Sequence, residues 1–192
     1  MNLNRPLTWM CGIFSWVLLS ALPVSAVTNR WTGAVNNDWF EDGNWSEGIR
    51  PVAGQSVLIN TNSSAIYTNV LLTNSTPWLA GFVISNRLMT FSNWTTALQA
   101  TNVAILKDGV LTLPAAFTNA QMSNRVHVVC SNLTIEVGGL INGLGLGFAG
   151  GNLTSGFGPG KGTAGSRGSG AGYGGRGGDG ARTTSFRVEP GG

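Results

Sequence analysis

The chain has 192 residues, of which 42% are hydrophobic and only 10% are charged, and its formal net charge is +3. A balance this close to neutral does not favour binding to nucleic acid or to an anionic membrane. The two cysteines are Cys11, which lies in an N-terminal apolar segment, and Cys130. If the N-terminal segment is removed, only Cys130 remains, and it cannot form an internal disulfide. The composition therefore excludes a small fold held together by disulfides.

Residues 1–26 are predicted to be a secretory signal peptide. Arg5 supplies a positive charge, residues 10–22 are apolar, and residues 24–26 have the small-any-small pattern that signal peptidase requires. An uncleaved anchor is the alternative, but the apolar run is shorter than the ~20 residues of a membrane-spanning helix. We therefore expect a secreted protein, extracellular or at the cell surface, with no membrane span after cleavage.

Residues 27–54 are rich in tryptophan and in turn-forming residues. Trp31, Trp39 and Trp45 are separated by Asn, Asp and Gly, a pattern that favours an irregular cap or hairpin over a helix. Aromatic rings of this size can cover the apolar end of a repeat body, which is the interpretation we adopt. In the alternative, Trp31, Trp39 and Trp45 form an exposed platform for carbohydrate contact.

Short apolar runs recur through residues 55–147 at intervals of 25, 21 and 23 residues. In the last three units a polar turn and a second apolar run follow, at 88–91, 110–113 and 133–137. Strand, turn and strand at this period predict the β-solenoid class, here a short right-handed parallel β-helix. An antiparallel sandwich is the alternative, because short strands with turn signals fit both. In the β-helix the residues that begin the first runs would align between neighbouring units: Val57, Phe82, Val103 and Val126.

Asparagine is frequent in this repeat zone, for example Asn86, Asn93, Asn102 and Asn132. Asparagine tolerates left-handed backbone geometry and bonds to nearby backbone groups, so it marks bends between strands. In neighbouring repeats its side chains can also form hydrogen-bonded ladders.

The composition changes from Gly138 onward, where 22 of 55 residues are glycine. A tract with so few side chains predicts flexible or loosely ordered chain over residues 148–192. The sequence ends at Glu189-Pro190-Gly191-Gly192 with no closing apolar strand. We therefore expect it to be the truncated N-terminal part of a longer protein.

The sequence predicts no catalytic, cofactor-binding or metal-binding residue, and hence no enzyme. Catalysis on β-helices needs carboxylates gathered on one face. Asp108 falls in a turn and Glu136 in a strand, and His127, the only histidine, lies between two valines. Residues 145–150 match the dinucleotide fingerprint, but the glycine, serine and proline that follow cannot form the helix it requires. The remaining acids of residues 27–147 lie in the cap: Asp38, Glu41, Asp42 and Glu47.

Three segments carry a resemblance to a known group of proteins. They are the tryptophan- and glycine-bearing residues 31–59, the strand-to-glycine turn at 133–141, and the glycine-rich tract 170–180. Together they resemble large secreted bacterial β-helix proteins, including autotransporter-like passenger domains and related repeat-rich surface proteins. The resemblance covers about residues 31–180. It implies a β-helix architecture and specifies almost nothing about activity.

These observations predict a secreted, non-enzymatic surface or extracellular scaffold, adhesin-like, whose partners would be extracellular polysaccharide or surface components. The alternative is the N-terminal part of a polysaccharide-active β-helix enzyme, or a carbohydrate-binding module. Clustered carboxylates in later repeats would favour the enzyme.

Overall fold

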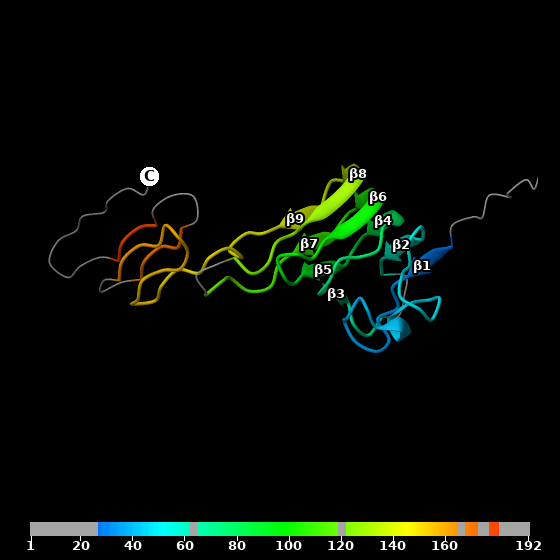
Figure 1. Ribbon diagram of the computed structural model, residues 1–192, viewed down its shortest axis with the longest axis horizontal. Helices are drawn as coiled ribbons and strands as arrows, with labels where there is room; N and C mark the ends of the chain where they lie inside the picture. Colours follow the sequence, from blue (N-terminus) through cyan, green and yellow to red (C-terminus); the bar gives the residue numbers. More distant parts are fainter. Residues whose placement is uncertain (1–26, 62–64, 119–121, 165–167, 173–176, 181–192) are drawn as a thin grey trace, which may run out of the picture.

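The computed structural model describes residues 27–61, 65–118, 122–164, 168–172 and 177–180. The predicted signal peptide (1–26) and the last residues (181–192) lie outside these ranges. The described chain is all-β, and its one helical element is a single 3-10 turn at Asp42–Asn44 (Figure 1). Within the described ranges, no helix is long and apolar enough to cross a membrane.

Two sheets of parallel strands make up the body of the molecule. The larger sheet has the order β1-β2-β4-β6-β8 and the smaller has the order β3-β5-β7-β9. The strands of the larger sheet are β1 (Thr28–Arg30), β2 (Ser56–Ile59), β4 (Leu79–Ile84), β6 (Leu98–Ile105) and β8 (Val128–Ile135). Those of the smaller sheet are β3 (Asn69–Leu72), β5 (Leu88–Phe91), β7 (Val110–Thr112) and β9 (Leu140–Asn142).

From β2 onward the chain alternates between the two sheets, so that each strand of the larger sheet is followed by one of the smaller. We call each such pair a unit: unit 1 is β2 and β3, unit 2 is β4 and β5, unit 3 is β6 and β7, and unit 4 is β8 and β9. All strand pairs between neighbouring units are parallel. The all-β class and the parallel pairing expected from the sequence are thus confirmed.

Apolar side chains at equivalent positions of the units form the core. Inward and outward residues alternate along a strand, so in-register pairing places like residues beside one another. The larger sheet contributes two such rows, and the smaller sheet a third. The rows are Val57, Phe82, Val103, Leu133; then Ile59, Ile84, Ile105, Ile135; and Val70, Met89, Leu111, Ile141.

The expected alignment of Val126 with Val103 is wrong. Val103 pairs with Leu133, and Val126 precedes β8. The run at 133–137, expected to be the second strand of its unit, therefore belongs mainly to the first strand, and β9 takes the second place. The cause is a long connection between β7 and β8, which puts Val103 and Leu133 30 positions apart and defeats a fixed period of about 23.

The expectation that asparagine marks bends between strands is confirmed for Asn86 and Asn93. It is wrong for Asn102 and Asn132, which lie inside β6 and β8, although these two form the expected ladder. Asn86 and Asn93 have positive φ angles of 49° and 78°, the left-handed geometry that ends a strand. Asn102 and Asn132 pair in register, and Asn132 Nδ2 donates to Asn102 Oδ1 at 2.8 Å. This rung of a ladder joins β6 to β8 on the outer side of the sheet.

The described part of the glycine-rich tract is held by backbone contacts. Gly162 N donates to Gly170 O at 3.0 Å, and Gly170 N donates to Gly178 O at 2.7 Å. A Cβ atom on Gly156 or Gly162 would overlap a carbonyl oxygen of a neighbouring segment. Glycine is required at these two positions because it alone lets two backbones approach so closely.

Candidate functional site

The three cap tryptophans form one aromatic cluster at the β1 end of the sheets. Trp45 lies edge-on to Trp31 and to Trp39, with ring centroids 5.1 and 4.7 Å apart. Trp39 also reaches Phe82 of unit 2, at 6.3 Å. The cluster thus packs directly onto the core of the repeat units.

Hydrogen bonds fix two of these rings. Trp45 Nε1 donates to the Trp39 carbonyl at 2.8 Å, and Trp31 Nε1 donates to the Tyr67 carbonyl at 3.1 Å. Among the described residues, no acceptor forms a hydrogen bond with the buried Trp39 Nε1. The side chain of Trp39 therefore contributes through its aromatic surface alone.

The same three rings were the residues for which carbohydrate contact was considered. Trp31, Trp39 and Trp45 are 1%, 0% and 3% exposed, respectively. A sugar stacks on an open ring face, and rings buried this deeply offer none. The geometry favours the capping role over the carbohydrate role for Trp31, Trp39 and Trp45.

The acidic side chains of the cap hold its loops in place. Asp42 Oδ1 accepts the backbone N–H of Arg50 at 2.9 Å and lies 3.1 Å from its Nε. Asp38 Oδ1 accepts from Phe40 N, and Glu41 Oε1 accepts from Gly43 N. Carboxylates placed in this way stabilise turns and the 3-10 helix.

His127 lies beside Arg125 at the start of β8. The Arg125 Nη2 atom is 3.2 Å from His127 Nδ1. A guanidinium only donates hydrogen bonds, so Nδ1 acts here as the acceptor. Across the described residues, no group of three or more His, Cys, Asp or Glu side chains could hold a metal ion.

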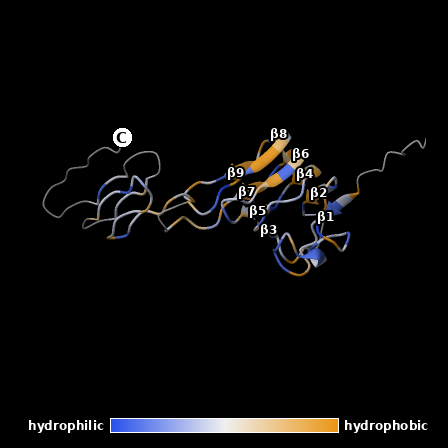
Figure 2. Cartoon of the chain, viewed as in Figure 1, coloured by the Kyte–Doolittle hydropathy of each residue, from blue (hydrophilic) through white to orange (hydrophobic). Residues whose placement is uncertain are grey.

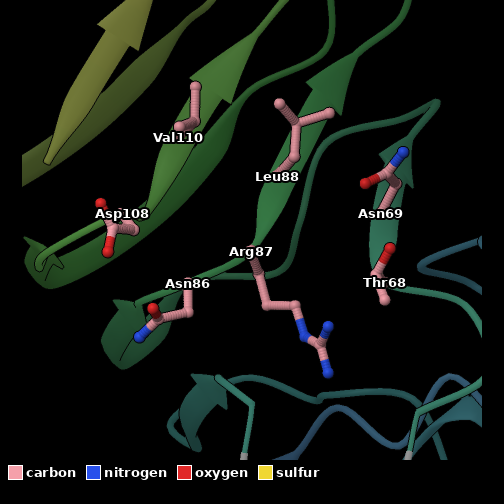
Figure 3. A pocket seen from close by; sticks show the side chains of 7 residues that line it. All are labelled: Thr68, Asn69, Asn86, Arg87, Leu88, Asp108 and Val110. Carbon is pink, nitrogen blue, oxygen red and sulfur yellow. The ribbon is translucent and has the colours of Figure 1, made fainter.

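A shallow polar pocket lies at the turns that lead into the smaller sheet (Figure 3). Its cavity volume is about 230 Å³. The Asn69, Leu88 and Val110 positions that line it are paired in register across β3, β5 and β7. The remaining lining residues are Thr68, Asn86, Arg87 and Asp108.

The polar groups of this pocket are partly committed to the fold. Arg87 Nε donates to the Asn60 carbonyl at 3.2 Å, and Figure 3 shows its guanidinium turned away from Asp108. Asn86 and Asp108 have positive φ angles, so both serve as turn residues between the two strands of a unit. The pocket offers hydroxyl, amide and carboxylate groups to a polar ligand.

An exposed aromatic site, which the sequence analysis did not single out, lies after β5. Trp94 is 41% exposed, and the Arg125 guanidinium lies 4.8 Å from the ring centroid. Arg125 Nε also donates to the Trp94 carbonyl at 2.7 Å, which orders the loop. The signal in the sequence was weak, because Trp94 and Arg125 are far apart in the chain and neither belongs to a motif.

No family model, no curated protein and no solved structure matches this chain. Function must therefore be argued from the geometry above.

Proposed function

We propose that this chain is a secreted, non-enzymatic scaffold of the cell surface or extracellular space, adhesin-like, built as a short right-handed parallel β-helix. The observation that carries the proposal is the parallel register kept over four units between two sheets. Parallel strands require crossover connections, and a chain that alternates between two sheets makes one turn per unit. Such crossovers are right-handed in nearly all proteins.

The placement of apolar, polar and acidic side chains supports a scaffold role. Each unit contributes apolar residues to the rows between the sheets, and the outward positions of the described strands carry polar, small or aliphatic residues and no acid. Repeat proteins of this kind present extended surfaces whose length grows with the number of units. Asp108 follows β6 in unit 3 and Glu136 follows β8 in unit 4, so both lie outside the strands, and the expectation of Glu136 inside a strand is wrong. In the register of these two units the acids stand two positions apart.

Secretion is tested by expressing the chain with its N-terminal segment and sequencing the exported product. The mature protein should begin at Val27, because residues 24–26 fit signal peptidase. The matched control is Ala26→Arg, which should block cleavage and leave residues 1–26 attached. Wild-type protein recovered from the cytoplasm with its N-terminus intact would contradict secretion.

The scaffold role is tested by immobilising the purified chain and offering extracellular polysaccharides and intact cells. We expect retention of at least one of these without any release of reducing sugar ends. Release of reducing ends that disappears in Asp108→Asn or Glu136→Gln would instead establish the enzyme alternative.

The carbohydrate-binding alternative now rests on Trp94 rather than on the cap. The ring of Trp94 is partly open to solvent and is held by Arg125, as a preorganised stacking surface would be. In a glycan array, Trp94→Ala should lose binding while Trp78→Ala, a second half-exposed tryptophan, keeps it. Equal binding by both variants and the wild type would remove this alternative.

A further inference from the structure

The far end of the two sheets leaves apolar rows uncovered. β8 and β9 are the edge strands of the larger and smaller sheets. The last members of the three rows, Leu133, Ile135 and Ile141, are 46%, 46% and 44% exposed. Their equivalents in units 1 to 3 are at most 2% exposed. Figure 2 shows β8 as a largely hydrophobic strand at this edge of the molecule.

An edge of this kind is a template for one more strand. Exposed edge strands present unpaired N–H and C=O groups, and proteins cover them or make them polar. Here the edge is long, and the side chains beside it are apolar. A segment that covers this edge should have the sequence pattern of the earlier units.

Units 3 and 4 end their first strand in the same way. Two inward apolar residues are followed by two further residues, a residue with positive φ, and a glycine. In unit 3 the positive-φ residue is Asp108 at 57°, and in unit 4 it is Gly138 at 87°. The two segments are residues 103–109 and 133–139.

The glycine that closes each segment is required by the close approach of the units. A Cβ on Gly109 would lie 2.5 Å from the Ile84 carbonyl oxygen, and a Cβ on Gly139 would overlap that of Ile105. The residue after each strand also donates to the previous unit: Leu106 N to Ile84 O at 2.8 Å, and Glu136 N to Ile105 O at 2.9 Å.

Residues 186–192, which lie outside the described part of the chain, repeat this pattern. In sequence, Phe186 and Val188 correspond to Leu133 and Ile135, and Glu189, Gly191 and Gly192 match Glu136, Gly138 and Gly139. Pro190 falls at the place of Val137. Within the described chain, the backbone N–H of Val137 and that of its unit 3 equivalent, Lys107, make no turn hydrogen bond, so a proline is tolerated there.

We propose that residues 185–189 bind in parallel along β8 as the first strand of a fifth unit, with Phe186 beside Leu133 and Val188 beside Ile135. Phe186 and Val188 cover the exposed ends of two core rows. Glu189 N donates to the Ile135 carbonyl, and Gly192 lies against that same carbonyl, as Gly139 does against Ile105.

The connection this requires has a precedent in the molecule. Unit 3 already sends a long excursion between β7 and β8, and the chain after β9 runs beside it. Phe117 N donates to Gly147 O at 2.7 Å, and the Phe117 and Phe148 rings lie 5.7 Å apart. On this proposal the glycine-rich tract is a second, larger excursion between β9 and the returning strand.

Cysteine cross-linking in the full chain tests this register. Cys11 and Cys130 are first replaced by serine. Thr134 is exposed, and the proposal places Arg187 directly beside it, so Thr134→Cys with Arg187→Cys should form a disulfide. Neighbouring strands are about 4.8 Å apart, within the ~4.4–6.8 Å that a disulfide spans between Cα atoms.

Two control pairs make the result decisive. Ala104→Cys with Thr134→Cys joins residues already paired between β6 and β8, and must cross-link if the variants fold. Thr134→Cys with Ser185→Cys keeps the same face but shifts by two residues, which places the Cα atoms about 8 Å apart, too far for a bridge.

We expect the Arg187→Cys pair to give a monomeric disulfide several-fold more abundant than the Ser185→Cys pair. Equal yields, or no cross-link while the control pair on β6 and β8 forms, would overturn the proposal. Disulfide-linked dimers on non-reducing gels would overturn it in favour of a second copy of the chain at this edge. None of these results alters the proposed surface role.

Discussion

At both ends of the repeat body, apolar core residues are exposed to solvent unless a further segment covers them. The two ends differ in whether the described chain supplies that segment. At the β1 end, the last strand of the larger sheet has only three residues. Two of them are polar and one is charged: Thr28, Asn29 and Arg30. At the other end it finishes in β8, a strand of eight residues with apolar side chains half open to solvent. The first end is closed within the described chain, and the second is not.

Closure at the β1 end involves both sheets. Asn29 occupies the place beside Val57 that apolar residues take in later units, fully buried, with its Nδ2 donating to Ile49 O at 2.9 Å. Beside the smaller sheet, Trp39 N donates to Leu71 O at 3.0 Å. A short polar edge with satisfied hydrogen bonds resists pairing with another chain. Parallel register alone therefore does not complete a repeat body, because each end needs its own covering segment.

The largest effect should come from removing a cap ring. Trp45→Ala deletes a 3% exposed indole that contacts two other tryptophans. Replacing a buried aromatic by alanine typically costs about 3–5 kcal/mol, a large share of a total stability of about 5–15 kcal/mol. Urea unfolding should show this loss, whereas the half-exposed control Trp94→Ala should change little. Similar midpoints for both variants would contradict the capping role.

Truncating an isoleucine inside unit 3 should lower the free energy of unfolding more than truncating its equivalent in unit 4 when the open end is uncovered. Ile105 is fully buried, so Ile105→Ala should cost about 2–5 kcal/mol. With Val188→Asp in the background, which removes the proposed cover, Ile135→Ala should cost less, because its side chain is 46% exposed in the described chain. In the otherwise unchanged chain, where Val188 lies beside Ile135, the cost should be closer to that at Ile105. Equal costs of Ile135→Ala in both backgrounds would contradict this cover.

A smaller effect is expected where units approach each other through a glycine. Gly139→Ala places a Cβ against the Ile105 carbonyl oxygen, and overpacking of this kind typically costs about 1–3 kcal/mol. Gly143→Ala is the matched control, since a Cβ there meets nothing within 4 Å. Thermal unfolding of the two variants separates them. A melting temperature lowered more by the control would be inconsistent with the close approach.

The smallest effect distinguishes two cap rings by their hydrogen bonds. Trp45 Nε1 donates to the Trp39 carbonyl, whereas Trp39 Nε1 has no acceptor among the described residues. Trp45→Phe should therefore cost about 1 kcal/mol more than Trp39→Phe, the net value of a typical hydrogen bond. Paired urea unfolding curves measure the difference. A greater loss in Trp39→Phe would show that its N–H is satisfied.

Sequence reasoning located most of the repeat zone and missed specific parts of it. The runs that became β2, β4, β5 and β7 stand out because apolar residues alternate between polar turns. β3 was missed although Val70, Leu71 and Leu72 form an apolar run like that of β2, because the connection from β2 to β3 is much longer than the turns between the strands of later units. Unit 4 was aligned on Val126 because spacing was read as fixed.

The candidate sites were less predictable than the fold. Three tryptophans separated by turn residues suit a cap and a sugar platform equally well, and burial against Phe82 distinguishes them. The polar pocket combines residues from three units, and Trp94 meets Arg125 across a long stretch of chain. No spacing rule reports such contacts, because they depend on how the units lie beside one another.

The sequence by itself determined that this chain is all-β and built from repeated short strands, since the pattern of apolar residues with asparagine and glycine turns is a local property. It left open whether the strands pair in parallel or antiparallel. Only the tertiary structure decided which residues face each other. Strand alternation has a period of two and carries no information on the length of a connection, so Leu133 rather than Val126 came to lie beside Val103. The same reason left the open edge at β8 invisible until the units were placed side by side.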